Sequence, residues 1–334
     1  MKYLKKSIFF LNIDLKICRF FGIKAGFLDF LKNFILRDNQ SIIGRRTYSE
    51  KYRNIISKLA SQFSDVLSEF QTHTFSSADL CDIGTKSPIW FFWWQGVNDD
   101  TPRPVVDCLN SIIANSKEHP VIVLSKSNID QYVEIPDFYY TKLKNGSFSL
   151  THFSDILRIE LLFTHGGIWM DSTIMMTEPL SKNIESSKFF TIHHGKFSDW
   201  HVSMGKWSGF FLATGKNNPM FHLLRDLMRA YWSQYDFLVC YLLIDCWIAL
   251  AYDNWDSFKS VIDSVPINNQ EVFCLDNHGN GAFSDFEYQS VQKSTTIFKI
   301  HYKRNFKLLT ENGSETYYGH IVRQNELKKG QSDE

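Results

Sequence analysis

Three charged side chains near the middle of the chain have types and spacing suited to binding a polar ligand. Asp155 and Arg158 lie three residues apart in the mostly apolar segment 149–163, and residues with this spacing share one face of a helix. A helix that is apolar around most of its circumference is buried, and a buried carboxylate or guanidinium is costly unless it is paired or contacts a polar ligand. Asp171 follows the apolar run 168–170. We therefore predict a site at which these three groups converge.

Glycines and apolar spacing predict the two elements that carry these side chains. The apolar pattern predicts a helix over 152–164, and Gly166-Gly167 stops it, because glycine adopts the left-handed conformation without a steric penalty. The next residues predict a short buried strand over 167–170, with Asp171 at its open end. Two plainer interpretations stay open: an ion pair that only holds a helix together, and an ordinary turn acid at a strand end.

The combined motif resembles a known family. It consists of S-D-x-x-R at 154–158, G-G-I-W-x-D-x-T at 166–173 and P-L at 179–180. This pattern is similar to bacterial capsular polysaccharide synthesis proteins, which belong to the glycosyltransferase family 32 superfamily together with yeast mannosyltransferases and the glucosylating domains of clostridial toxins. The similarity extends over roughly residues 85–305.

The resemblance implies an α/β fold of the GT-A type, with a Rossmann-like, mostly parallel mixed sheet flanked by helices and a helical N-terminal region. We expect this helical region at 1–84, a glycosyltransferase domain at 85–310 and a C-terminal tail at 311–334. Apolar runs that alternate with turn residues from residue 87 onward are typical of such a sheet.

Periodicity predicts the individual elements. Helical spacing in the first 80 residues ends near 72–77. The expected strands are 89–94, 120–125, 137–141, 167–170, 173–177, 189–193 and 208–214, and the expected helices are 104–116, 128–133, 152–164, 219–231 and 236–252. For 257–334 we expect short strands between loops, with a charged end at 326–334 that frays.

The activity that the resemblance implies is transfer of a sugar from a nucleotide-diphosphate sugar donor to a glycan or lipid-linked glycan acceptor, with retention of configuration, in capsular or other surface polysaccharide synthesis. Such a reaction needs cations or hydrogen-bond donors at the departing diphosphate and a rigid hold on the sugar. The resemblance gives the catalytic roles to Asp155, Arg158 and Asp171. Two alternatives stay open: a degenerate, non-catalytic nucleotide- or glycan-binding protein, and a glycosylating effector that acts on a protein acceptor.

Further donor-binding residues are expected around this cluster. Beside the three charged groups the set comprises Trp94, Gln95, Gly96, Gly167, Ser172 and Lys299. An aromatic ring at Trp94 could stack on a nucleotide base where the expected strand ends, although large aromatics are about as often part of a core. Lys299 lies where related enzymes fold a C-terminal segment over the diphosphate, and an ordinary strand is an equal alternative.

The expected metal and acceptor residues are less regular. Many glycosyltransferases of this fold carry Asp-x-Asp at the strand end, whereas this chain has Asp171-Ser172-Thr173. The resemblance implies a divalent cation, Mn²⁺ or Mg²⁺, at Asp171, Thr173 and His301, but a hydroxyl is a poorer ligand for these ions than a carboxylate. Asp245 interrupts an apolar helix pattern, where an unpaired acid is costly. It either faces the acceptor sugar or pairs with a buried polar group.

Composition and charge narrow the partners and the location. The chain of 334 residues has 36 Lys and Arg against 36 Asp and Glu, so no basic bias points to nucleic acid. Residues 1–60 hold 13 basic residues against four acids and are rich in Phe, Ile and Leu. Such a segment suits peripheral contact with an anionic membrane, or equally a helical cap with solvated lysines. The apolar run at 7–13 is too short for a secretory signal or a membrane span, and the six cysteines show no CxxC spacing. Both features favour the cytoplasm, with peripheral contact at the inner membrane face as a further location.

Overall fold

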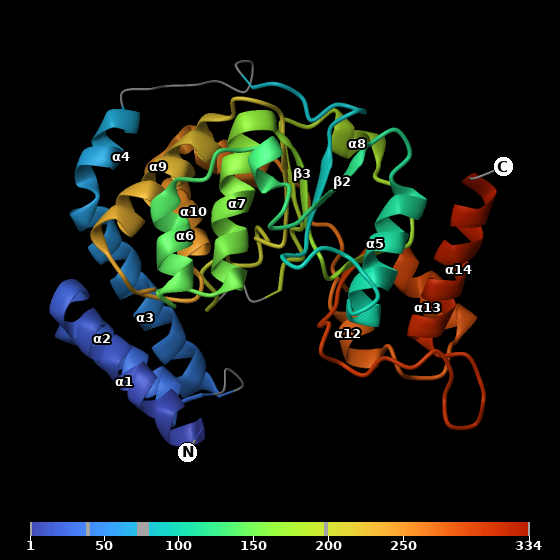
Figure 1. Ribbon diagram of the computed structural model, residues 1–334, viewed down its shortest axis with the longest axis horizontal. Helices are drawn as coiled ribbons and strands as arrows, with labels where there is room; N and C mark the ends of the chain where they lie inside the picture. Colours follow the sequence, from blue (N-terminus) through green and yellow to red (C-terminus); the bar gives the residue numbers. More distant parts are fainter. Residues whose placement is uncertain (1, 38–40, 72–79, 197–199, 333–334) are drawn as a thin grey trace.

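The computed structural model describes residues 2–37, 41–71, 80–196 and 200–332, with a five-stranded sheet of order β2-β1-β3-β6-β5 at its centre (Figure 1). The strands are β1 (Ile89–Phe92), β2 (Val121–Leu124), β3 (Gly167–Asp171), β5 (Phe189–Thr191) and β6 (Phe211–Thr214). β1 pairs in parallel with β2 and β3, while β6 pairs antiparallel with β3 and β5. Of these five strands, only β6 therefore runs against the others. The expected α/β class with a mostly parallel mixed sheet is confirmed.

A second, two-stranded sheet joins the segment after β3 to the C-terminal part of the chain. β4 (Ile174–Met176) pairs antiparallel with β7 (Ile297–Lys299), and Ile174 is the register partner of Lys299. Because β4 starts only two residues after β3 ends, this pairing brings a distant segment to the edge of the main sheet.

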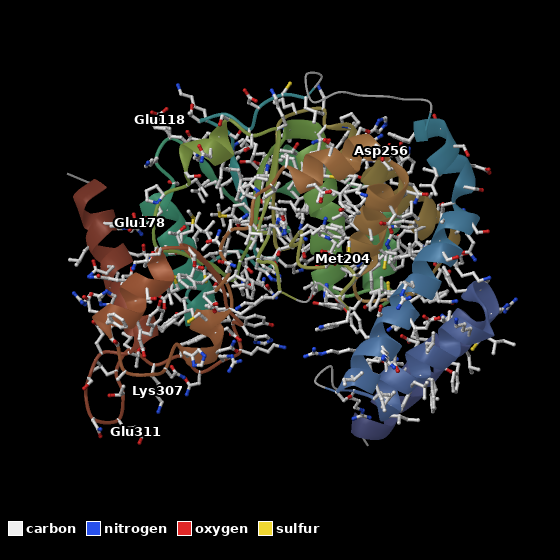
Figure 2. All side chains as sticks on the ribbon, turned by 180° about the vertical axis from the view of Figure 1, so that it is seen from behind. Glu118, Glu178, Met204, Asp256, Lys307 and Glu311 are labelled. Atoms are coloured by element: carbon white, nitrogen blue, oxygen red, sulfur yellow. The ribbon has the colours of Figure 1, made fainter. Side chains whose placement is uncertain are left out.

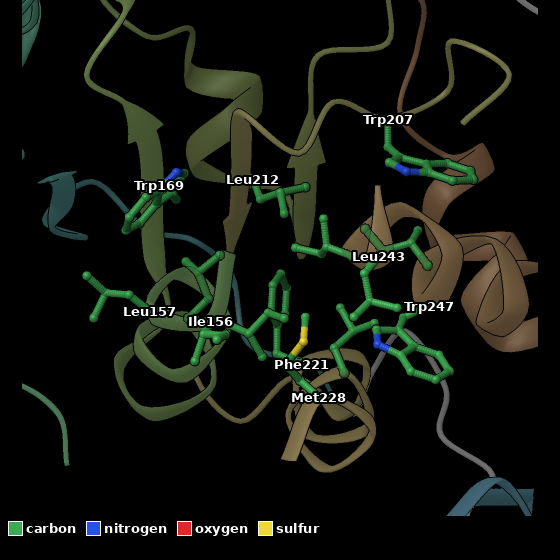
Figure 3. Packing of buried hydrophobic residues seen from close by; sticks show 14 of the residues in the cluster. Ile156, Leu157, Trp169, Trp207, Leu212, Phe221, Met228, Leu243 and Trp247 are labelled. Carbon is green, nitrogen blue, oxygen red and sulfur yellow. The ribbon is translucent and has the colours of Figure 1, made fainter. Parts of the chain in front are cut away.

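Helices cover the sheet on both sides and supply most of the core. The main ones are α5 (Arg103–Asn115), α7 (Leu150–His165), α9 (Pro219–Gln234), α10 (Leu243–Asn254) and α14 (Tyr317–Ser332). Figure 3 shows side chains of α7, α9 and α10 gathered around Leu212 of β6, among them Phe221, Met228 and Trp247. The sheet is therefore buried against this helical layer.

Two glycines fix the passage from α7 into β3. Gly166 and Gly167 have φ angles of 67° and 99°, which disfavour residues with a side chain. A Cβ atom on Gly167 would lie 2.6 Å from the carbonyl oxygen of Pro88, the residue directly before β1. The glycine stop predicted here is confirmed.

The N-terminal region is helical in its described residues, as expected. It contains α1 (Lys2–Phe21), α2 (Ile23–Phe30), a π-helical turn (Leu31–Ile35), α3 (Ile42–Gln62) and α4 (Ser64–Gln71). α1 and α2 pack so closely that a Cβ atom on Gly26 would meet the Cys18 sulfur at 2.2 Å. Seen from both sides, these helices and the C-terminal helices lie at opposite ends of the molecule, with the sheet between them (Figures 1 and 2). The predicted end of this region, 72–77, lies outside the described residues.

Several element predictions were wrong. Residues 137–141, expected as a strand, begin helix α6 (Asp137–Lys144). An acidic first turn and lysines in the last turn favour this helix, and the aromatic run suggested a strand only through its β-propensity. The helix expected over 236–252 begins only at Leu243.

The C-terminal part is more helical than expected. Within the described residues the charged end is helical rather than frayed, because α14 continues through Ser332 and packs against α5. Between β6 and α14, β7 is the named strand in the described residues. The remaining helices are a 3₁₀ turn (Ile129–Gln131, where 128–133 was expected), α8 (Lys182–Glu185), α11 (Asp256–Asp263), α12 (Cys274–His278) and α13 (Asp285–Gln292).

Candidate functional site

The carboxyl ends of β1 and β3 form the edge at which the charged motif lies. The two strands are parallel, and Asp171 at the end of β3 is the register partner of Phe92 at the end of β1. Trp93 and Trp94 follow directly after β1. In open α/β sheets, ligands bind outside the carboxyl ends of the strands. This edge of the sheet is therefore a candidate binding site.

Arg158 connects the two acids of the motif. Its side chain is 4% exposed, and its Nη2 atom lies 3.1 Å from Asp155 Oδ1 and 3.1 Å from Asp171 Oδ1. Its Nη1 atom donates to the carbonyl oxygen of Gly209, and its guanidinium lies 5.0 Å from the ring centre of Trp169. Its Nε atom is buried without an acceptor among the described residues. The structure thus brings together the three side chains that the sequence pattern singled out.

Asp171 is held in its ionised form by the groups around it. Its Oδ1 atom accepts a hydrogen bond from Trp169 Nε1 at 2.9 Å, and its Oδ2 atom lies 2.6 Å from Lys299 Nζ. Burial by itself raises the pKa of this carboxyl, but Lys299 and Arg158 outweigh that effect and lower the pKa below its ordinary value. The carboxylate is therefore a fixed negative charge at the sheet edge.

Lys299 reaches the same place from the far end of the sequence. It is the last residue of β7, and its Nζ atom lies 2.7 Å from Thr173 Oγ1 as well as contacting Asp171. Its ammonium also lies 5.1 Å from the ring centre of Phe210. Both of the expectations for this residue, a strand position and a basic group at the site, describe where it lies.

Two adjoining cavities open on this cluster. The first, here the tryptophan cavity, has a volume of about 430 Å³. It is lined by Phe92, Trp93, Trp94, Gln95, Leu150, Thr151, Ser154, Trp169, Asp171, Ser172, Thr173, Tyr241, Lys299, Ile300, His301, Tyr302 and Lys303. The second, the aspartate cavity, measures about 260 Å³ and contains Asp155, Arg158 and Asp245. Thr151, Ser154, Asp171, Tyr241 and Lys299 line both cavities.

Two expected donor residues lie outside these cavities. Gly96 and Gly167 are not among the lining residues in the described part of the chain. Gly167 begins β3, at the end opposite Asp171, where it allows close backbone packing. Gly96 closes the turn after β1 with a φ angle of 77° and a hydrogen bond from its amide to the Trp93 carbonyl.

Asp245 lines the aspartate cavity. Its side chain is buried, and its Oδ1 atom accepts a hydrogen bond from Trp207 Nε1 at 3.0 Å. Burial, reinforced by the nearby charge of Asp155, raises the pKa of Asp245 to about 7. This acid therefore titrates near neutral pH, unlike Asp171.

Sequence reasoning missed several residues that line the cavities. His194 and His201 line the aspartate cavity, and burial lowers the pKa of each to about 4, so both rings are neutral near pH 7. Tyr302 and Lys303 line the tryptophan cavity beside His301. The spacing of His194 and His201 fits no standard zinc motif, so nothing in the sequence assigned them to the site. Tyr302 and Lys303 directly follow His301, which the sequence analysis did include.

The three residues of the expected metal site each already contact a lysine residue. Lys299 contacts both Asp171 Oδ2 and Thr173 Oγ1, and the ring Nδ1 atom of His301 accepts from the amide of Lys303 at 3.2 Å. Among the described residues, no group of three or more His, Cys, Asp or Glu side chains is arranged to hold a metal ion. The oxygen atoms present therefore fit a divalent cation poorly while Lys299 lies between them.

A larger cavity of about 650 Å³ lies elsewhere, against α12 and α13. Its lining contains one carboxylate, Glu287, and no lysine or arginine. A ligand with a diphosphate group would find neither a lysine nor an arginine there, so the charged sheet edge is the better candidate site.

The structure is that of an α/β protein with a cluster of charged side chains beside two cavities at one edge of its sheet. The chain belongs to the capsular polysaccharide synthesis protein family, whose model matches residues 37–321. It is 21% identical over 182 residues to the glycosyltransferase afumC from Aspergillus fumigatus, a match that covers 51% of this chain and 45% of that protein. The chain thus spans less than half the length of this curated relative. A solved structure named PaToxG glycosyltransferase has 15% sequence identity and a TM-score of 0.40, with coverage of 77% of this chain and 99% of the other.

Proposed function

We propose that this protein is a glycosyltransferase with a GT-A-type active site. It moves a sugar from a nucleotide-diphosphate sugar to a glycan or lipid-linked glycan acceptor in capsular or other surface polysaccharide synthesis, with retention of configuration as the motif's resemblance implies. The observation that carries the proposal is the cluster of Asp155, Arg158, Asp171 and Lys299, which lies where two cavities meet at the carboxyl edge of the sheet.

The tryptophan cavity suits the donor nucleotide. Trp94 lines this cavity, and we assign its ring to the base of the donor. The ring packs edge-on against Phe153, with ring centres 5.3 Å apart, which limits its movement. The basic segment His301–Lys303 lines the same cavity, and cationic groups are what a diphosphate requires.

The charge cluster suits the reaction itself. When the sugar–diphosphate bond breaks, negative charge grows on the leaving diphosphate and positive charge grows on the anomeric carbon. Arg158 and Lys299 stabilise the first, and Asp155 and Asp171 hold the sugar hydroxyls in place. The unpartnered Nε atom of Arg158 shows that the guanidinium is not fully satisfied by protein.

The aspartate cavity suits the acceptor. Its most buried acid, Asp245, has a pKa of about 7, so it can accept or donate a proton near neutral pH. The neighbouring His194 and His201 are neutral there and can form hydrogen bonds with sugar hydroxyls without adding charge.

The test of this function is a screen followed by turnover. UDP-, GDP- and CMP-sugars are first screened for thermal stabilisation of the protein, because a ligand that binds the native state raises its melting temperature. The stabilising donor is then incubated with glycan acceptors, and release of nucleoside diphosphate is measured.

Variants assign the turnover to the site. We expect Asp171→Asn and Arg158→Ala each to lower turnover on the order of 100-fold or more. Arg225→Ala is the matched control, because this arginine of α9 pairs with Asp226 and lines neither cavity. Near-normal turnover in either site variant would remove the assignment, and donor binding without any release of diphosphate would instead support a non-catalytic binding protein.

We also propose that the N-terminal helices contact an anionic membrane surface. Eight large apolar side chains are exposed on these helices in the described residues: Leu11, Leu15, Phe20, Ile23, Phe27, Ile35, Ile42 and Ile43. The same stretch carries the basic residues Lys16, Arg19, Lys24, Arg37 and Arg46. Two acids of this stretch, Asp14 and Asp29, are buried. A surface that combines apolar side chains with positive charge fits anionic lipid headgroups.

This contact would be peripheral, and vesicles can test it. In the described part of the chain, no helix is both long and apolar enough to cross a bilayer. We expect the protein to sediment with vesicles containing phosphatidylglycerol, less so at high salt, and not with vesicles of phosphatidylcholine alone. Leu15→Ser/Ile23→Ser should weaken sedimentation at least fivefold, whereas Phe286→Ser, which removes an 85% exposed side chain elsewhere, should not. Equal sedimentation of both variants would contradict the contact.

A further inference from the structure

The ammonium of Lys299 lies between the two side chains that would otherwise hold a metal ion. Its Nζ atom is 2.6 Å from Asp171 Oδ2 and 2.7 Å from Thr173 Oγ1. A Mg²⁺ ion would need to lie about 2.1 Å from the same two oxygen atoms. The ammonium and such an ion would therefore compete for one position, and their like charges would repel at short range.

The backbone holds Lys299 at this position. Lys299 is the register partner of Ile174, which directly follows Thr173, and the amide of Ile300 donates to the Thr173 carbonyl at 3.0 Å. The amide of Lys299 itself donates to the Val272 carbonyl at 2.8 Å. Three backbone contacts thus fix the start of the side chain, independently of the ion pair that its end forms.

Lys299 lines both cavities, whereas of its two neighbours Phe298 lines neither and Ile300 lines only the tryptophan cavity. Phe298 and Ile300 are buried in a hydrophobic cluster with residues of α14, whereas the Lys299 side chain is 22% exposed and points to the cavities. Successive side chains of a strand point to opposite faces, so a shift of one residue would remove the cation from the site. The position is therefore determined by the strand, not by the flexible end of a lysine.

The charges of the motif match an ammonium better than a divalent ion. Asp-x-Asp supplies two carboxylates, and these balance two positive charges. Here Asp171 supplies one carboxylate and Thr173 a neutral hydroxyl, which balance one positive charge. A hydroxyl oxygen is a good acceptor for an ammonium N–H but a weak ligand for Mg²⁺ or Mn²⁺.

We propose that Lys299 replaces the divalent cation, so that this site binds the diphosphate of its donor without a metal ion. An ammonium has three N–H donors. Asp171 and Thr173 accept two of them in the described contacts, and the third donates to a phosphate oxygen. The inference rests on the proposed function, because it assigns the group that neutralises the leaving diphosphate.

Nucleoside diphosphates alone test this inference, without any turnover. Thermal stabilisation by UDP and by GDP is measured in EDTA and in excess MnCl₂. We expect the wild type to be stabilised equally in both, and Lys299→Met to bind at least tenfold more weakly. Lys307→Met is the control. Lys307, which is labelled in Figure 2, lies on a loop in the C-terminal part of the chain and lines neither cavity.

Lys299→Met could bind nucleotide weakly only because it folds poorly, and a double variant distinguishes that case. Thr173→Asp/Lys299→Met restores two carboxylates and removes the ammonium. We expect it to bind UDP or GDP in MnCl₂ but not in EDTA, and to take up one Mn²⁺ in calorimetric titration. The wild type should take up none at this site.

The outcomes separate this inference from the proposed function. Nucleotide binding by the wild type that requires MnCl₂ would overturn the role of Lys299 and leave the glycosyltransferase proposal standing. No nucleotide binding in either condition would count against the proposed function. In that case Mn²⁺ titration of the protein alone still decides: saturable uptake by the wild type that Asp171→Asn abolishes would overturn the inference, and uptake by the double variant only would support it.

Discussion

Arg158 carries the charge balance of the site, because its guanidinium contacts two carboxylates at once. Asp155 and Asp171 both lie 3.1 Å from its Nη2 atom, and a buried pair of like charges is costly without such a partner. Lys299 adds a second cation on the other oxygen of Asp171. The charges of the two carboxylates and the two cations therefore cancel, and removing any one of the four groups leaves an unbalanced charge.

Asp245 should make stability depend on pH in a way that a neutral residue does not. Its pKa is raised from 3.8 to about 7, mainly by burial and then by Asp155, while Trp207 and Arg158 act in the opposite sense. The free energy of unfolding that this raised folded-state pKa contributes is fully present below about pH 4. It is lost as the pH rises through about 7, because the buried carboxyl then becomes charged. Asp245→Asn should therefore gain stability over the wild type between pH 5 and pH 8, by up to about 4 kcal/mol.

Urea unfolding of both proteins at the two pH values measures this gain. The asparagine keeps the acceptor for Trp207, so the hydrogen bond at 3.0 Å is a shared feature rather than a difference. A stability difference that is the same at pH 5 and pH 8 would mean that Asp245 is not titrating in this range.

The residues of the site that could be predicted are those set by local rules. Asp155 and Arg158 share a helix face because of their spacing, and Asp171 lies where a short strand ends, so the sequence placed them together. The position of Lys299 could not be derived in this way, because 128 residues separate it from Asp171 and only the pairing of β7 with β4 joins them. The family resemblance suggested Lys299 for the donor site, but not its contact with Thr173.

At the scale of elements, α7 is the support of the site, and a second ion pair ties it to α9. Glu160 of α7 is buried and accepts two hydrogen bonds of 2.7 Å each from the Nε and Nη2 atoms of Arg229. Such a two-pronged contact fixes both position and angle. The helix that carries Asp155 and Arg158 is thereby held from its far face as well as by its apolar packing.

Breaking this clamp from one side should destabilise the protein. Arg229→Met leaves a buried carboxylate without its partner, and removing one member of a buried pair commonly costs several kcal/mol. Because the Arg229 side chain is 38% exposed, solvent screening reduces the expected loss to about 2 kcal/mol. Glu160→Leu/Arg229→Met removes both charges and should recover most of that loss in guanidinium unfolding. Equal losses in the single and double variants would contradict the clamp.

Secondary structure was predictable where a periodic pattern had clear stops, and less so elsewhere. α7 and β3 follow from apolar spacing and two glycines. The segment at 137–141 was misjudged because aromatic residues favour strands locally, whereas in the fold only Tyr139 of α6 is buried. Local preference is a weak guide when tertiary packing decides which face is covered.

At the scale of the whole molecule, a second hydrophobic cluster positions the C-terminal wall of the site. It joins Met175 of β4, Phe298 of β7 and Ile321 of α14. α14 also donates a hydrogen bond of 2.6 Å from Tyr318 to Asp107 of α5. α14 therefore holds β7, and with it Lys299, in place beside the main sheet.

Weakening this second cluster should loosen the site from a distance. Ile321 is fully buried in α14, and Ile321→Ala should lower the free energy of unfolding by about 2–4 kcal/mol through lost burial and the cavity left behind. The Lys299 amide donates a hydrogen bond to the Val272 carbonyl. Because α14 supports β7, hydrogen exchange at this amide should speed up more in the variant than exchange at the amides of β1. Hydrogen exchange followed by mass spectrometry measures both segments, and Ile267→Ala, at a 58% exposed position, is the control. If protection in β7 stays unchanged while global stability falls, then β4 alone holds Lys299 in place, and α14 contributes to stability without shaping the site.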